Sequence, residues 1–265
     1  MLCDEMGMIG PMTKVRDGVL ILTALVSLCG CDPARPLNQL SAGETGRVTS
    51  VTAGDVLTLD SGLVVRLAEV QAPYQDQPGA EASRADLQRL VGGQKVRLFY
   101  GGARRDAYGR ALAQVRRENG RLWVQALLLR DGWARVRTYA DNHALVAPLL
   151  NDEAEARQAR RGLWAMPDYG VRLPSEVGPD LREFQIVEGR VISVTPARSG
   201  DYLEFSADRR GFAVQIPASA RAQMQAGGME AENLVGRMVR VRGNLGWNEV
   251  MRVDHPQQIE RLREP

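Results

Sequence analysis

Residues 46–74 read GRVTSVTAGDVLTLDSGLVVRLAEVQAPY. Apolar and polar residues alternate through three runs, and the turn-forming triplets AGD at 53–55 and DSG at 60–62 separate these runs. The pattern predicts three short antiparallel strands joined by tight turns. It also places a carboxylate, Asp55, in the first turn and a guanidinium, Arg66, in the third strand. An acid and an arginine on a small barrel suit contact with a phosphodiester.

Residues downstream of this stretch complete a compact domain that we expect to span 43–166. The predicted helices are 81–91, 122–130 and 144–161, and the further strands are 95–100 and 110–117. Together these elements predict a mainly β fold with helices (α+β), in which a five-stranded barrel is capped by three helices.

A second domain is expected over 184–263, after a Pro-containing linker at 167–183. Its opening GRVISVT at 189–195 repeats GRVTSVT at 46–52 almost residue for residue, and a Gly-Asp pair follows in both. Such an internal repeat predicts two related barrels. The second barrel would be smaller and of the oligonucleotide/oligosaccharide-binding (OB) type.

The N-terminal residues 1–31 have the features of a bacterial lipoprotein signal. Lys14 and Arg16 precede an apolar run at 18–30, which is shorter than a membrane-spanning helix and ends at Leu-Cys-Gly-Cys31. This ending resembles the lipobox, in which the last cysteine, here Cys31, is lipidated. We therefore expect export to the cell envelope, a lipid anchor in the membrane on the periplasmic side, and a polar tether at 32–42. An ordinary signal peptide and an uncleaved anchor are the alternatives.

Overall composition adds little to these local signals. The formal net charge of the 265 residues is only +2, so a general affinity for polyanions does not follow from composition. His143 and His255 stand alone in the sequence and predict no zinc site. Trp247 is the tryptophan for which we consider stacking on a base.

Five motifs in a fixed order resemble the staphylococcal-nuclease-like (thermonuclease) family. They are GDV at 54–56, VRLAEVQAP at 65–73, PGAEAS at 78–83, RDAYGRALA at 105–113 and RRGLW at 160–164. The resemblance covers 44–166 and implies an OB barrel capped by three helices. In active members of the family, a calcium ion and two arginines hold the scissile phosphate of DNA or RNA, and a glutamate activates water.

The resemblance assigns roles to five residues of this chain. Asp55 matches the first metal-ligating aspartate. Arg66 and Arg110 match the two phosphate-binding arginines, and Asp106 and Tyr108 match the supporting positions beside the second arginine.

The next motif departs from the family pattern. Active members read Asp-Thr-Pro-Glu where this chain reads Gln-Ala-Pro-Tyr at 71–74. Gln71 keeps an oxygen but loses the charge, which predicts a calcium site of low affinity. Tyr74 cannot serve as a carboxylate base near neutral pH, and losing a positioned base costs roughly 10²–10⁴-fold in rate. Glu69, on the strand face of Gln71 by period two, and Asp76, in the following loop, are the candidate substitute acids.

Three functions are therefore open at the level of sequence. The first is an envelope lipoprotein that binds nucleic acid or another phosphate-bearing ligand, with weak or no hydrolysis. The second is an active calcium-dependent endonuclease that uses Glu69 or Asp76. The third is a non-enzymatic scaffold that binds protein or glycan. A purely structural role is also open for Arg66, as an ion-pair partner of Glu69 or Asp106.

Overall fold

The computed structural model describes residues 34–179, 181, 183–246 and 248–263. By its internal contacts the chain divides into Met1–Cys31 and one compact unit, Asp32–Pro265. The described residues do not include the predicted signal segment with Cys31, nor Trp247. Among the described residues, no helix is both long and apolar enough to cross a membrane.

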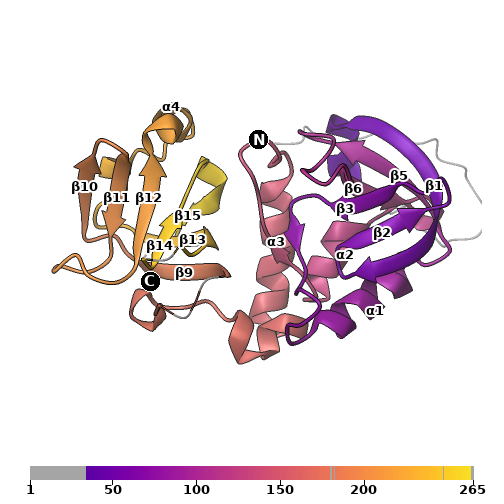
Figure 1. The fold of residues 1–265 in the computed structure, drawn as a ribbon, viewed down its shortest axis with the longest axis horizontal. Helices are drawn as coiled ribbons and strands as arrows, with labels where there is room; N and C mark the ends of the chain where they lie inside the picture. The colour runs from indigo at the N-terminus through magenta and orange to yellow at the C-terminus, as the bar shows by residue number, and fades with distance from the viewer. Residues whose placement is uncertain (1–33, 180, 182, 247, 264–265) are drawn as a thin grey trace, which may run out of the picture. The chain divides into compact units, whose positions relative to one another are not determined.

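Five strands close the first barrel (Figure 1). They are β1 (Ser41–Ala53), β2 (Val56–Leu59), β3 (Val64–Leu67), β5 (Lys95–Tyr100) and β6 (Ala111–Arg117). The long strand β1 pairs with β5 through its first half and with β2 through its second half. Closure comes from the parallel pairing of β3 with β6. The alternating residues of 46–74 therefore form the strands that the sequence predicted, and the predicted fold class is confirmed.

Three helices cover this barrel: α1 (Ala80–Val91), α2 (Val124–Arg130) and α3 (Val146–Gln158). Leu87 of α1 and Leu128 of α2 are fully buried in the same core as the barrel strands. Two helices are shorter than predicted. Before α2, the residues Leu122–Trp123 form β7 and pair with β6, and Trp123 donates from its indole to Gln114 (2.8 Å). After α3, Arg160 takes a positive φ of 50°, which a continuing helix does not allow.

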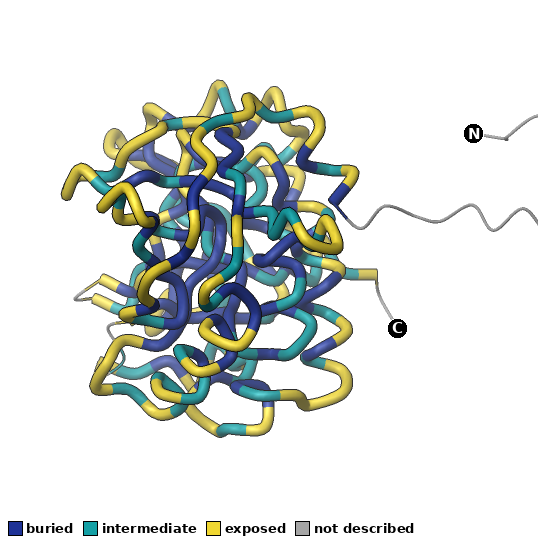
Figure 2. Tube along the Cα trace, turned by 90° about the vertical axis from the view of Figure 1, so that its right-hand side faces the viewer, coloured by how far each residue is buried: buried dark blue, intermediate teal, exposed yellow. Residues whose placement is uncertain are grey.

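The expected tether behaves differently from a free spacer. Arg35–Gln39 form a 3-10 helix, η1, and Ala34 and Leu37 are fully buried in the core of the first barrel. Because these apolar side chains pack with the barrel, residues from Ala34 onward belong to the folded body. Figure 2 shows buried residues, in dark blue, along the inner parts of the trace, and exposed residues, in yellow, mostly at its turns.

The C-terminal strands form two sheets. They are β9 (Phe184–Arg190), β10 (Ser193–Ala197), β11 (Gly200–Glu204), β12 (Ala213–Pro217), β13 (Met238–Asn244), β14 (Val250–Arg252) and β15 (Ile259–Arg261). β9 pairs with β13 as β1 pairs with β5, and β12 pairs in parallel with β14 as β3 pairs with β6. A short helix, α4 (Arg221–Ala226), stands between β12 and β13, where α1 stands between β3 and β5. The repeated opening therefore leads into the same order of pairings, although β9 and β10 replace one continuous strand.

Buried polar contacts join the first barrel to the C-terminal sheets within the Asp32–Pro265 unit. Arg242 of β13, which is 1% exposed, forms ion pairs with Glu153 of α3 (3.1 Å) and with Glu260 of β15 (2.6 Å). His255 lies 2.9 Å from the hydroxyl of Thr138 and stacks on His143, with ring centroids 4.9 Å apart. The two histidines are therefore neighbours, which their separation in the sequence did not indicate.

Candidate functional site

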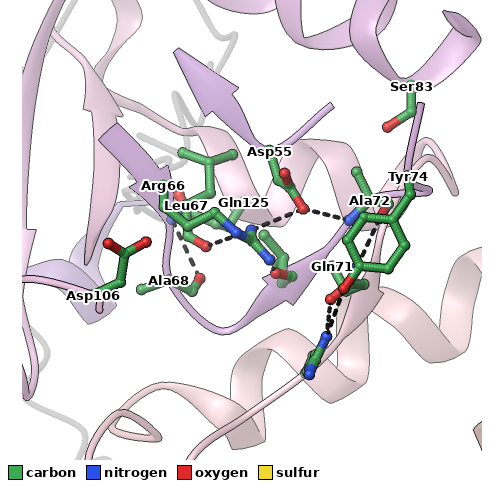
Figure 3. Close-up of polar contacts among 12 residues, drawn as sticks. Asp55, Arg66, Leu67, Ala68, Gln71, Ala72, Tyr74, Ser83, Asp106 and Gln125 are labelled. Atoms are coloured by element: carbon green, nitrogen blue, oxygen red, sulfur yellow. Dashed lines mark hydrogen bonds and ion pairs between the residues drawn. The ribbon is translucent and has the colours of Figure 1, made fainter. Parts of the chain in front are cut away.

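Asp55 lies in the turn between β1 and β2 and is turned inward. One carboxylate oxygen, Oδ2, accepts a hydrogen bond from the backbone N–H of Ala72 (2.7 Å) and forms an ion pair with Nη1 of Arg66 (2.8 Å) (Figure 3). The preceding Gly54 permits this close packing, because a Cβ there would lie 1.9 Å from the hydroxyl of Ser83 on α1. Asp55 is consequently only 6% exposed.

Arg66 projects from β3 and its guanidinium is fixed from several sides. Besides Asp55, Nη1 reaches the carbonyl oxygens of Val70 (3.1 Å) and Leu67 (3.2 Å). The ion-pair partner is Asp55, so the suggested pairing with Glu69 or Asp106 was wrong. Asp55 and Arg66 are far apart in the sequence because all of β2 lies between them. In the structure, β2 pairs with β3 so that Val56, the neighbour of Asp55, lies opposite Arg66.

Arg110 is positioned by Asp106 in the turn that precedes β6. One oxygen of Asp106 accepts the backbone N–H groups of Tyr108 (2.9 Å) and Arg110 (3.0 Å), and the other accepts Nε of Arg110 (2.7 Å). Burial raises the pKa of the Asp106 carboxyl, but the hydrogen bonds and charge of Arg110 outweigh it and leave the pKa below its usual value. Tyr108 is 84% exposed, and its ring centroid lies 5.2 Å from the Arg110 guanidinium.

One pocket of about 320 Å³ brings both arginines together. Its polar lining comprises Arg66, Glu69, Arg105, Asp106, Tyr108, Arg110, Tyr139 and Asp141. Within the described part of the chain, the terminal nitrogens of Arg110 form no hydrogen bond with protein atoms, so they can donate to a ligand. Asp55 lies behind Arg66 and is not part of this lining.

Glu69 also lines the pocket, but not because it alternates with Gln71 along one strand, as the sequence predicted. It takes a positive φ of 62° between β3 and β4 (Val70–Gln71), so it does not share a strand face with Gln71. Its two oxygens accept the N–H of Leu145 (3.2 and 3.0 Å). Burial raises the pKa of the Glu69 carboxyl to about 7, although hydrogen bonds oppose the rise. Asp76 is exposed in the loop after β4 and does not line the pocket.

An arginine that the sequence reasoning missed contacts both substituted positions. Arg137 donates from Nη1 to the side-chain oxygen of Gln71 and, at 3.4 Å, to the hydroxyl of Tyr74. Burial raises the pKa of the Tyr74 phenol, but hydrogen bonds with Gln71 and Arg137 and the charges of Arg137 and Arg66 bring it below its usual value. Arg137 reaches this place because β4 pairs with β8 (Arg135–Val136), a two-residue pairing without a sequence signal.

The side-chain oxygens available as metal ligands at this site do not fit a tightly bound calcium ion. Calcium takes six to eight oxygen ligands, several of them carboxylate. Oδ2 of Asp55 already accepts two donors, and the oxygen of Gln71 already accepts Arg137. No group of three or more His, Cys, Asp or Glu residues that could hold a metal occurs within the described ranges.

Comparisons with known proteins agree with this fold. The family model described as staphylococcal nuclease homologue matches residues 64–166. An uncharacterized endonuclease of Escherichia coli O157:H7 is 35% identical over 132 residues, which cover 49% of this chain and 82% of the relative. The thermonuclease of Staphylococcus intermedius is 30% identical over 169 residues, which cover 58% of this chain and 99% of the relative. The match therefore extends over nearly the whole length of that thermonuclease.

Proposed function

Because this chain belongs to the family of staphylococcal nuclease homologues, we propose that it binds nucleic acid, or another phosphate-bearing ligand, through Arg66 and Arg110. We propose further that its phosphodiester hydrolysis is weak or lost. The observation that carries the proposal is the single pocket of about 320 Å³ that both guanidiniums line.

The geometry of the two arginines suits a phosphate ligand. A guanidinium presents several donors in a plane and binds phosphate oxygens in bidentate fashion. Asp106 holds Nε of Arg110 and so leaves the terminal nitrogens for a ligand. The exposed ring of Tyr108 beside Arg110 offers a surface on which a base can stack.

The substituted positions explain why binding and cleavage would separate. Tyr74 stands where active members of the family have the general base, and its hydroxyl contacts Arg137. A phenol has an ordinary pKa of about 10 and is a poor base near neutral pH. Loss of a positioned base costs roughly 10²–10⁴-fold, whereas the phosphate contacts of Arg66 and Arg110 do not depend on it.

The position of Glu69 favours a second candidate, residual hydrolysis without the family's base. Its carboxyl lies in the same pocket as both arginines and titrates near neutral pH, with a pKa of about 7. A carboxyl with such a pKa can accept a proton from water if the ligand binds within reach. Asp76 offers no comparable placement, because it is exposed outside the pocket lining.

Binding is tested with fluorescently labelled single-stranded DNA and RNA and the full chain. The double variant Arg66→Ala with Arg110→Ala is expected to lose at least about 100-fold in affinity, because each charged hydrogen-bonding group contributes about 1.5–3 kcal/mol. The matched control is Arg221→Ala, an arginine of the second barrel that is also paired with an aspartate (2.7 Å). Unchanged affinity in the double variant, or no binding by the unsubstituted chain, would remove the proposal and favour the scaffold alternative.

Cleavage of the same oligonucleotides on a gel separates the two candidates. The first predicts little or no product at enzyme-to-substrate ratios at which binding is saturated, and the same amount of product from Glu69→Gln. Product that disappears in Glu69→Gln, while binding is retained, would establish the second candidate instead.

We also propose that Cys31 carries a lipid that anchors the protein to the periplasmic side of an envelope membrane. The support is the apolar run at 18–30 that ends in Leu-Cys-Gly-Cys. Cys31→Ser is expected to move the protein from the membrane fraction to the soluble fraction, or to block its processing. Unchanged membrane association and processing would count against lipidation.

A further inference from the structure

The guanidinium of Arg137 lies at the two positions where this chain departs from its active relatives. Its Nη1 donates to the side-chain oxygen of Gln71, which stands in place of the second metal carboxylate, and approaches the hydroxyl of Tyr74 (3.4 Å). The oxygen that a metal would need is therefore already bound by a fixed positive charge.

Several contacts hold Arg137 in this position. Its backbone N–H donates to the carbonyl of Glu69 (3.1 Å), which ties it to the segment between β3 and β4. Its guanidinium stands over the rings of Tyr139, at 5.2 Å, and Phe184, at 5.7 Å from the centroid. Cation–π contacts of this kind stabilise a guanidinium over the face of a ring. The side chain is thus placed by the fold and does not depend on a ligand.

A calcium ion would meet unfavourable electrostatics here. It would share the oxygen of Gln71 with Arg137 and the carboxylate of Asp55 with Arg66, which lies 2.8 Å from that carboxylate. A divalent ion beside two guanidiniums is repelled, because like charges in contact repel one another even near a protein surface. Asp55 is the only carboxylate at the matched metal positions that could offset this repulsion.

We propose that Arg137 substitutes for the metal ion, so that this site binds phosphodiesters through three guanidiniums and without calcium. The inference rests on the proposed function, since it concerns the same ligand. It adds a residue outside the matched pair, and it assigns the site to anionic phosphodiesters in the metal-free state.

Two hollows that have Tyr139 in common carry the three arginines. Arg137 lines a hollow of about 240 Å³, together with Tyr139, Phe184 and Arg252. Tyr139 lines both this hollow and the pocket of Arg66 and Arg110. In the proposed complex, a single strand with one phosphate at Arg66 and Arg110 crosses Tyr139 and brings a further phosphate to Arg137.

Calorimetric titration with Ca²⁺ tests the exclusion of the metal directly. We expect no binding by the full chain at millimolar Ca²⁺, and a gain of Ca²⁺ binding when Arg137→Gln is combined with Gln71→Asp, which removes the guanidinium and restores the carboxylate. Sub-millimolar Ca²⁺ binding by the unsubstituted chain would overturn the proposal.

The affinity for labelled single-stranded DNA, measured in Ca²⁺ and in EDTA, tests the role of Arg137 in binding. Equal affinity in both buffers is expected, with a loss of about tenfold in Arg137→Gln and a smaller loss in Arg137→Lys, which keeps the charge. Arg221→Gln is the control, and thermal melting reports whether each variant is folded. Tenfold tighter binding in Ca²⁺, or unchanged affinity in a folded Arg137→Gln variant, would overturn the proposal. If the unsubstituted chain binds no DNA, the proposed function fails, and the Ca²⁺ titration alone decides whether Arg137 excludes the metal.

Discussion

The first barrel and the C-terminal sheets carry the same Gly-Asp pair, yet the surroundings of the two aspartates differ. Asp55 and Asp201 are both buried, 6% and 8% exposed, and each forms an ion pair with an arginine, at 2.8 Å with Arg66 and at 2.7 Å with Arg221. The first arginine comes from strand β3, whereas the second comes from helix α4. The repeated sequence therefore determines the position of each aspartate, whereas the arginine that pairs with it comes from a different element in each half of the chain.

The charge of the neighbouring pocket separates the two sites further. The pocket beside Arg66 holds three arginines (Arg66, Arg105 and Arg110) and three acids (Glu69, Asp106 and Asp141). The pocket of about 330 Å³ beside Arg221 holds that one arginine and three acids (Asp201, Glu230 and Glu232). We therefore expect the first pocket to accept a phosphate and the second, in which acids outnumber the arginine, to repel it. An Asp–Arg pair in this fold is therefore a structural feature, and affinity for an anion depends on the groups around it.

The largest expected effect concerns the stability contributed by the two pairs. Asp55→Ala is expected to destabilise the protein by about 3–5 kcal/mol, because it leaves the Arg66 guanidinium, with 14% of its side chain exposed, without its carboxylate. Asp201→Ala is expected to cost much less, because 46% of the Arg221 side chain is exposed and water can replace the partner. Urea denaturation of both variants measures the difference, and equal losses would contradict it.

A second difference is the buried carboxyl of the first pocket, which predicts a dependence of stability on pH. Burial raises the pKa of Glu69 from 4.5 to about 7, so the folded state binds more protons than the unfolded state between these values. The contribution of Glu69 is therefore constant below pH 4.5 and falls by about 3 kcal/mol as the pH rises through 7. Urea denaturation at pH 4.5 and at pH 8 measures this change.

Glu69→Gln is expected to remove that pH dependence, since glutamine has the shape of the protonated carboxyl. The exposed Glu232, in the second pocket, supplies the control. Glu232→Gln should leave the pH dependence as it is in the unsubstituted chain. A Glu69→Gln variant that remains as pH-dependent as the unsubstituted chain would show that other groups cause the change.

The sequence was sufficient where the signal is local. Alternation and turn residues predicted the strands of 46–74, and the structure confirms the fold class. The order of motifs pointed to Arg66 and Arg110, which the structure places in one pocket. Local patterns were informative here because each strand and turn is specified by adjacent residues.

What the sequence missed depends on contacts between distant residues. Arg137 reaches Gln71 through the pairing of β4 with β8, and strands of two residues are too short for periodicity to reveal. Glu69 left the expected face because its positive φ of 62° interrupts the strand, and period two holds only within a continuous strand. The stacking of His143 on His255 depends likewise on contacts between the first barrel and the C-terminal part of the chain.

The smallest expected effect is on the salt dependence of binding, and it tests the comparison of the two pockets most directly. For single-stranded nucleic acid, the logarithm of affinity falls with the logarithm of salt concentration by about 0.7 for each phosphate that is neutralised. Two phosphate contacts then predict a loss of about sevenfold between 50 and 200 mM salt. Arg66→Ala with Arg110→Ala should flatten this dependence, whereas Arg221→Ala should not alter it, because its guanidinium is bound by both oxygens of Asp201 (2.7 Å each) beside two further acids. Fluorescence anisotropy across the salt series distinguishes these outcomes. A change of slope in Arg221→Ala would place part of the anion-binding surface on the C-terminal sheets and contradict the contrast between the two Asp–Arg pairs.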